Sequence, residues 1–306
     1  MMEARRLRAL LGCTTALTAL ALTQPARAQA PLATPTGGAV VAGSASIAQA
    51  PGATTISQGT PRAAINWQTF NVGSKATVTF RQPSRQAVTL NRVLAPDPSM
   101  IAGHITANGS IVLVNPDGIV FAHGAEVNAA GLVASAPGIT NRNFMAGRMI
   151  FNQPAHPNAR VVNHGTITIG QAGLAALVAP EVANSGVIAA KLGSVVLAGA
   201  RTATLDLYGD GLVSIDVAGA VKTVPMGPGG KPAKALVTNG GTIVAEGGTV
   251  LLTAKAVDGL IQNLVDAGGT ISANGVAGQH GGTVLVQGVG GSISIAGTLT
   301  ASGEGS

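Results

Sequence analysis

Cysteine is nearly absent from this 306-residue chain: Cys13 is the only one, and it lies within the first 28 residues. Those residues start with basic side chains, continue through the uncharged stretch Ala9 to Leu22, and end in the small-x-small pattern of Ala26 and Ala28. This order is typical of a secretory signal peptide cleaved after Ala28. The stretch is too short for a membrane anchor, which needs about 20 apolar residues. The exported remainder would contain no cysteine, so disulfides would not hold its fold.

Charged and aromatic residues are also scarce, at 10% and 2% of the chain, whereas ordinary domains contain about 25% charged residues. Without residues 1–28, 14 basic and 11 acidic side chains remain and form no cluster, which gives a nucleic-acid partner little support. Disorder is not expected, because 46% of the residues are hydrophobic. Many Val, Ile, Leu and Thr residues and 43 glycines favour an all-β chain with frequent turns.

Patterns of catalysis and metal binding are missing as well. No G-x-S-x-G, P-loop or dinucleotide fingerprint occurs, and the five histidines lack metal-ligand spacing. The densest acidic stretch holds Asp206, Asp210 and Asp216, and carboxylates of this kind can bind calcium or perform acid–base catalysis. Their spacing matches neither the EF-hand nor the calcium-binding nonapeptide repeat. We therefore expect no metal, no cofactor and no catalytic residue, with a calcium site at these aspartates left open.

The second half of the chain repeats itself. The sequence of residues 163–167, Asn-His-Gly-Thr-Ile, recurs in altered form at 184–188, 239–243 and 267–271, and a second strand motif follows each of two copies. Recurrence every twenty-odd residues is typical of a solenoid, in which successive coils stack and bury their apolar sides. We predict an all-β fold, a right-handed parallel β-helix of about 12 coils, with an N-terminal cap and short extra-helical strands. A β-sandwich is the main alternative fold.

The composition divides the chain into five parts. Residues 1–28 are the predicted signal peptide, and the Pro/Ala/Thr/Gly-rich residues 29–45 form a flexible lead-in. Residues 46–217 form the first domain. A loop or insertion rich in proline and lysine covers 218–235, and β-helical repeats, either complete or truncated, fill 236–306.

Three short motifs in the first half carry a family resemblance. Residues 65–71 read INWQTFN, residues 91–93 read NRV, and residues 107–134 read ANGSIVLVNPDGIVFAHGAEVNAAGLVA. Their combination and order resemble the N-terminal haemagglutination-activity domain of two-partner-secreted adhesins, of the filamentous haemagglutinin and high-molecular-weight adhesin type. The resemblance covers about Ser46 to Val217. Asp117 departs from the family's usual NPNG motif.

The resemblance implies an exported partner of a two-partner secretion system rather than an enzyme. In such systems an outer-membrane β-barrel transporter engages the N-terminal domain through its periplasmic recognition domains, and the chain passes outward unfolded. It implies an adhesin-like protein that a Gram-negative bacterium exports through the periplasm to its surface or to the medium. A glycan or protein on host cells is a possible receptor. The motif residues that it assigns to transporter recognition are Asn66, Trp67, Phe70, Asn71, Asn91, Arg92, Asn115, Pro116, Asp117 and Gly118.

Each motif also has a purely structural interpretation. The NPDG corner can be a turn that fixes strand register. Trp67, the only tryptophan, is expected to plug the N-terminal end of the solenoid, although sugar stacking is an alternative. For the whole chain, the alternatives to an exported adhesin are a secreted β-helical polysaccharide lyase or hydrolase and a passive matrix component.

Overall fold

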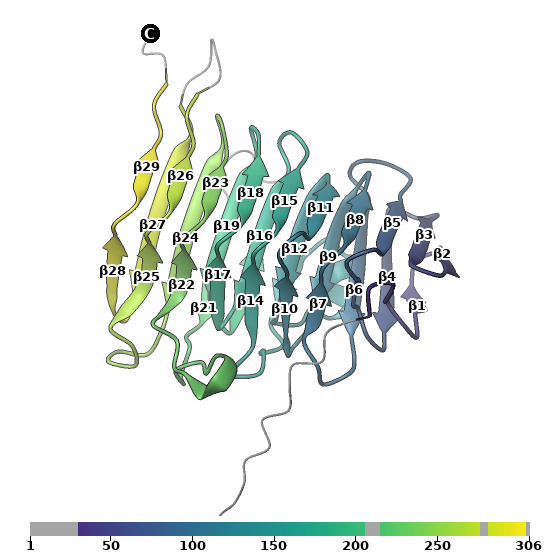
Figure 1. Cartoon of the computed structure of the whole chain (residues 1–306), viewed down its shortest axis with the longest axis horizontal. Helices are drawn as coiled ribbons and strands as arrows, with labels where there is room; N and C mark the ends of the chain where they lie inside the picture. Colours follow the sequence, from purple (N-terminus) through teal and green to yellow (C-terminus); the bar gives the residue numbers. More distant parts are fainter. Residues whose placement is uncertain (1–29, 206–214, 276–280, 304–306) are drawn as a thin grey trace, which may run out of the picture.

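The computed structural model describes residues 30–205, 215–275 and 281–303, and its strands form three long sheets along one axis (Figure 1). The nine-stranded sheet contains β1 (Ala39–Ala42), β4 (Arg62–Trp67), β6 (Val88–Val93), β9 (Ser110–Val114), β12 (Gly131–Ser135), β16 (Leu174–Ala179), β19 (Ser194–Gly199), β24 (Thr249–Lys255) and β27 (Thr283–Val289). The seven-stranded sheet contains β7 (Ser99–Ile101), β10 (Gly118–Phe121), β14 (Arg160–Asn163), β17 (Glu181–Asn184), β22 (Ala235–Asn239), β25 (Asn263–Ala267) and β28 (Ser292–Ile295).

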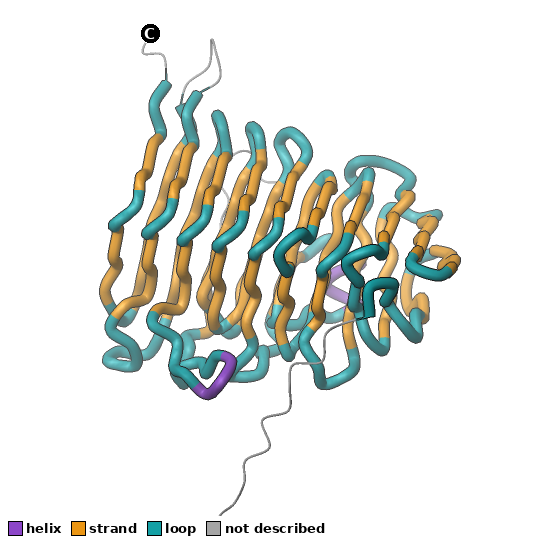
Figure 2. The backbone as a smooth tube through the Cα atoms, viewed as in Figure 1, coloured by secondary structure: helices purple, strands orange, loops and turns teal. Residues whose placement is uncertain are grey.

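The ten-stranded sheet completes each coil. Its strands are β2 (Ala45–Ala50), β3 (Ala53–Gln58), β5 (Thr77–Arg81), β8 (His104–Ala107), β11 (Glu126–Ala129), β15 (Thr166–Ile169), β18 (Val187–Ala190), β23 (Thr242–Val244), β26 (Thr270–Ser272) and β29 (Thr298–Thr300). The chain visits the nine-, seven- and ten-stranded sheets in turn, and equivalent strands pair in parallel. The predicted parallel β-helix is confirmed (Figure 2).

The prediction of about 12 coils was too high. Eight strands of the nine-stranded sheet run parallel to one another in the described part of the chain, one for each coil. The difference arises because residues 136–159 and the described residues between 200 and 234 leave the helix before the next coil begins. They contain helix α1 (Asn141–Met145), strands β13 (Met149–Phe151), β20 (Thr202–Leu205) and β21 (Ile215–Gly219), and the 3₁₀ turn η1 (Pro228–Gly230).

Two hydrophobic cores hold the coils together. The first fills the inside of the helix with stacked Val, Ile, Leu and Ala side chains. The second lies on the outer face of the nine-stranded sheet, where Phe144 of α1, Phe151 of β13 and Leu205 of β20 pack over it. Because both faces of this sheet are covered, β16 is buried along its whole length, whereas β15 alternates exposed and buried residues. The small antiparallel sheet β13–β20–β21 supplies the predicted extra-helical strands.

The N-terminal end of the helix is closed by antiparallel strands. β1 pairs antiparallel with β4, and β2 pairs antiparallel with β3. Beneath them Trp67 is fully buried, in edge-to-face contact with Phe70 at a centroid distance of 5.7 Å. Trp67 therefore occupies the plug position expected from the sequence. Residues 39–42, part of the predicted flexible lead-in, form β1 of this cap, and the other domain boundaries stay predictions.

The corners between the seven- and ten-stranded sheets are nearly uniform. Two residues separate the strands at every described corner except the one after β10, which has four, and the residue before each ten-stranded-sheet strand of the later coils is glycine. At Gly241 a Cβ would lie 2.7 Å from the carbonyl carbon of Ser185 and 2.9 Å from the nitrogen of Gly186, both in the preceding coil. These glycines form a column in which the backbones of successive coils touch, so there is no room for a side chain.

Buried asparagines stack beside this glycine column. Asn163, Asn184 and Asn239 occupy equivalent positions at the ends of β14, β17 and β22, each no more than 1% exposed. The Nδ2 of Asn163 donates to Oδ1 of Asn184 at 2.8 Å, and Nδ2 of Asn184 donates to Oδ1 of Asn239 at 2.8 Å. The ladder ties three coils together with side-chain hydrogen bonds inside an apolar core, where such bonds are hard to replace.

The surroundings of His164 change the pKa of its imidazole ring. Its ring stacks on His123 at 4.9 Å, and Nδ1 lies 2.6 Å from Oγ of Ser185. Burial, followed by repulsion from His123 and Arg160, lowers the pKa of His164 below its ordinary value of 6.5. The unfolded chain therefore binds the proton first, so this contribution to stability is complete above about pH 6.5 and declines as the pH falls through the window below it.

We expect His123→Gln to raise the pKa of His164 part of the way toward its ordinary value. The substitution removes one repulsive partner but leaves burial, the larger cause, in place. Titration of the His164 ring followed by NMR measures the change, and Arg148→Gln, a cation on a distant part of the fold, serves as the control. An unchanged pKa in the His123 variant would contradict the arrangement of the two rings.

Candidate functional site: the NRV and NPDG motifs

The NRV and NPDG motifs, 22 residues apart in the sequence, meet at one cleft. Asn91, Arg92 and Val93 end strand β6, and the NPDG residues form the corner between β9 and β10 in the next coil. Between them lies a cavity of about 330 Å³, lined by Arg92, Leu94, Pro116, Asp117, Gln153 and His156. The β-helix places the two motifs together because β6 and β9 are adjacent parallel strands.

Arg92 connects three segments of the chain from the outer face of β6. Its Nη1 donates to Oδ1 of Asn66 on β4 at 3.0 Å, and its Nη2 donates to the carbonyl of Ile139 at 2.7 Å and to Oδ1 of Asn141 at 2.9 Å. Burial lowers the pKa of Arg92, although a guanidinium remains protonated at physiological pH. The side chain thus fastens the excursion that contains α1 to the first coils.

Asn115 organises the NPDG corner from inside. The residue is fully buried, its Nδ2 donates to the carbonyl of Asp97 at 2.9 Å and to Oγ of Ser99 at 3.0 Å, and its Oδ1 accepts from the nitrogen of Asp117 at 3.0 Å. Gly118 closes the turn on the carbonyl of Asn115 at 3.0 Å and has a φ of 113°, which favours glycine. The corner is therefore a register-fixing turn, as its structural interpretation predicted.

Asp117 and Pro116 are the half-buried members of this corner. Asp117 pairs with Nδ1 of His156 at 2.7 Å across the cleft. The departure from the family's NPNG motif thus introduces a carboxylate that has a basic partner. No pattern in the sequence marks His156 as a partner of Asp117, because His156 lies 39 residues away in an excursion without any repeat.

The remaining motif residues lie toward the N-terminal cap. Asn91 is fully buried and accepts a hydrogen bond from Nε1 of Trp67 at 3.0 Å. Phe70 packs on Trp67, and Asn71 accepts from the nitrogen of Met100 through Oδ1 at 2.8 Å. The side chains of Asn66 and Arg92, and those of Trp67 and Asn91, therefore form two separate pairs that bridge β4 and β6 on opposite faces of the sheet. Phe70 and Asn71 lie farther from the NPDG corner, toward the cap.

Several other predictions concern residues that lie outside the described ranges or that do not gather into a group of metal ligands. The cleavage residues Ala26 and Ala28, together with Asp206 and Asp210, lie outside the described residues, and Asp216 is placed only as a backbone position of β21. Within the described ranges no three His, Cys, Asp or Glu side chains come together as metal ligands. No helix there has the length and apolar character of a membrane span.

Comparison with known proteins gives the fold a family. The family model described as the TPS secretion domain matches residues 32–304, almost the whole chain. The chain belongs to the TPS secretion domain family. It is similar to the crystal structure of the HMW1 secretion domain from Haemophilus influenzae, with a TM-score of 0.74 and 27% identity over 88% of this chain and 67% of that one. The filamentous hemagglutinin secretion domain shares the fold at a TM-score of 0.55 and 17% identity, covering 89% of this chain and 97% of that one.

Curated relatives are much longer than this TPS domain. The chain is 47% identical over 81 residues to a heme/hemopexin-binding protein of Haemophilus influenzae, an alignment covering 26% of this chain and 9% of the relative. A second such protein, from strain Rd of that species, is 42% identical over 101 residues, or 33% of this chain and 11% of the relative. The chain thus spans about a tenth of their length.

Membership in the TPS family settles the class of function. TPS domains are secretion domains of adhesin-like exoproteins, which cross the outer membrane of Gram-negative bacteria with the help of an outer-membrane transporter. The predicted role as the exported partner of a two-partner secretion system is confirmed at this level.

Proposed function

We propose that the transporter recognises the NRV and NPDG motifs in the extended chain, before the β-helix folds. The observation that carries this proposal is the burial of Asn91 and Asn115, both 0% exposed and engaged in hydrogen bonds within the folded domain. A partner cannot reach these amides after folding. In the extended chain the same amides and the neighbouring β-prone segments are free to add to a sheet of the transporter's periplasmic domains.

Folding would then drive the later steps of export. Each coil that forms outside the cell buries apolar side chains against the preceding coil, which disfavours return of the chain. Each motif thus has two roles. In the extended chain it is a recognition segment, and in the folded domain it forms a turn or side-chain hydrogen bonds of the first coils. The absence of cysteine after residue 28 is in keeping with this route, because no covalent loop can form before the chain is threaded.

The export test compares motif variants with a variant that is only less stable. We expect Asn91→Ala and Asn115→Ala to retain most of the protein in the periplasm when it is expressed with its transporter. Gly241→Ala disrupts coil stacking more than 120 residues beyond the motifs, so it should still be exported but be sensitive to protease outside the cell. Immunoblots of periplasm and medium measure the distribution.

Two results would overturn the proposal. Normal export of both motif variants shows that these residues are not read, and equal retention of Gly241→Ala shows that folding stability alone decides export. Unfolding and refolding of each purified variant measures its free energy of unfolding. Export can then be compared between the motif variants and Gly241→Ala with their stabilities known.

For the whole protein we propose a role at the cell surface or in the medium as an adhesin that contacts a glycan or protein receptor. The family of adhesin-like exoproteins supports this role. Adhesion of cells expressing the chain, compared with cells expressing the transporter alone, tests it.

A further inference from the structure

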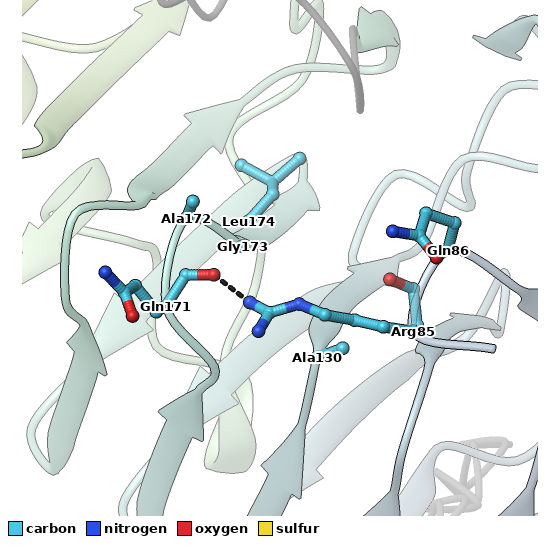
Figure 3. A pocket seen from close by; sticks show the side chains of 8 residues that line it. Arg85, Gln86, Ala130, Gln171, Ala172, Gly173 and Leu174 are labelled. Atoms are coloured by element: carbon cyan, nitrogen blue, oxygen red, sulfur yellow. Dashed lines mark hydrogen bonds between the residues drawn. The ribbon is translucent and has the colours of Figure 1, made fainter.

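A separate pocket opens at the corner between the ten- and nine-stranded sheets (Figure 3). It has a volume of about 430 Å³ and lies between the loop of residues 82–87 and the turn of residues 170–173. Its floor is made by the small or buried residues Ser110, Ala130 and Leu174 from three successive coils. No lining residue is acidic.

Arg85 crosses this pocket. Its Nη2 donates to the backbone carbonyl of Gln171 on the far wall, as Figure 3 shows. A second hollow of about 390 Å³, lined by Asn108, Asn128 and Thr168 among others, lies against the same arginine. Among the described residues no carboxylate approaches Arg85 within 4.0 Å, so this exposed cation has no ion-pair partner in the depression.

The loop that carries Arg85 is held in place from below. Gln82 is 7% exposed; its Oε1 accepts from the nitrogen of Gly109 at 2.8 Å, and its Nε2 donates to the carbonyl of Ser110 at 3.0 Å. Gln82 and Asn108 also exchange two hydrogen bonds of 2.7 Å between backbone and side chain. The guanidinium is therefore presented by an anchored loop, which reduces the entropy lost when a ligand binds.

The opposite wall contains a strained residue. Ala172 has a φ of 59°, a conformation that costs an L-residue about 1 kcal/mol. Its nitrogen donates to the carbonyl of Lys191 in the next coil at 3.0 Å. Leu192 and Gly247 have the same left-handed conformation, with φ of 54° and 67°, at the equivalent corner of the next two coils, so this turn is a repeated feature of the β-helix that fixes the shape of the pocket wall.

We propose that this pocket binds an acidic saccharide through its carboxylate. The planar guanidinium of Arg85 matches a carboxylate in a two-pronged hydrogen bond. The amide of Gln171 and the hydroxyl of Ser110 lie around it and suit sugar hydroxyls. A peptide fits less well, since the strands at this corner are already paired on both sides and no deep apolar pocket is present. The binding does not depend on recognition by the transporter.

The test uses the purified chain with glucuronate and glucose, which differ in a carboxylate against a hydroxymethyl group. Saturation-transfer NMR and calorimetry should detect saturable binding of glucuronate alone. Arg85→Gln should weaken it about tenfold, the loss expected for one charge-assisted contact. Arg85→Lys, which keeps the charge without the planar fork, should give an intermediate loss. Arg81→Gln removes an exposed arginine outside the pocket and should leave binding unchanged.

Acetylglycine, a carboxylate without sugar hydroxyls, separates a saccharide site from a general anion site. Weaker binding of acetylglycine than of glucuronate supports the proposal. The proposal is overturned if acetylglycine binds as tightly as glucuronate, or if glucose does. It is also overturned if neither sugar binds, or if Arg85→Gln binds glucuronate as tightly as the unmodified chain. Circular dichroism and denaturation midpoints of all variants show that each comparison is made on folded protein.

Discussion

Alanine at position 241 should lower the free energy of unfolding by about 3 kcal/mol, although it adds only one methyl group. The new Cβ would lie within 3 Å of backbone atoms of Ser185 and Gly186 in the preceding coil, and backbone cannot turn aside as a flexible side chain can. The two coils would have to separate, which weakens the sheets at all three faces. Denaturant unfolding followed by circular dichroism measures the loss.

The neighbouring glycine provides a matched control. No atom lies within 4 Å of the position that a Cβ would occupy on Gly240, and this residue is exposed in the same two-residue turn. We expect Gly240→Ala to change stability by less than about 0.5 kcal/mol. Equal effects at 240 and 241 would show that the coils are not in backbone contact there.

The Gly241→Ala substitution should also allow the coils on its two sides to unfold separately. In a stack where each coil touches only its neighbours, a weak interface lets the two sides unfold separately. Limited proteolysis of the Gly241 variant should release the coils after β22 while the N-terminal coils remain protected. A uniform loss of protection along the chain would contradict a one-dimensional stack.

The second large effect is expected at Asn184, in the middle of the asparagine ladder. Asn184→Ala removes both ladder hydrogen bonds. Oδ1 of the buried Asn239 loses its donor, and Nδ2 of Asn163 keeps only the longer bonds to the carbonyls of Gly165 and Val187, at 3.3 and 3.4 Å. Unmet buried groups cost about 1–3 kcal/mol each, so we expect a total near 3 kcal/mol. Thermal and urea unfolding measure it, and Asn128→Ala on the exposed face of β11 is the control.

A triple variant separates the hydrogen bonds from the packing. Replacing Asn163, Asn184 and Asn239 together by leucine leaves no orphaned side-chain amide and extends the apolar core, although the nitrogen of Gly165 loses its acceptor on Asn163. The stability of this variant should exceed that of Asn184→Ala. If the triple variant is the less stable of the two, the ladder contributes through shape rather than through unmet polar groups.

The sequence predicted the fold well where corners were marked by turn chemistry. The apolar runs of residues 110–114 and 118–121 have the bounds of β9 and β10, because Asn-Gly and NPDG define their ends. By contrast, the run of residues 101–106 has no marked turn in the sequence, yet it contains the end of β7 and most of β8, with a corner at 102–103. That corner carries Ala-Gly without Asn or Pro, and only the column of stacked glycines makes it a turn.

The candidate site was predicted in its residues but not in its contacts. The motifs indicated Arg92 and Asn115. Ile139 and Asn141, which bind Arg92, and His156, which lines the cleft, come from an excursion with no repeat. Helix α1 has five residues, too few for a helical period to appear, and begins with Thr140 as its cap. Contacts that join segments 39–49 residues apart follow from the path of the excursion, which a single sequence does not specify.

The three corners of the coil differ in how much length they permit. Connections from the nine- to the seven-stranded sheet range from the single residue 180 to residues 200–234, whereas those into the ten-stranded sheet stay at two or four residues. A segment that leaves the helix between the nine- and the seven-stranded sheets and returns at the same corner does not change the rise per coil. This corner is therefore the natural place to graft a foreign epitope or affinity tag, and a domain that already carries two large insertions there should export such cargo with its ladders intact.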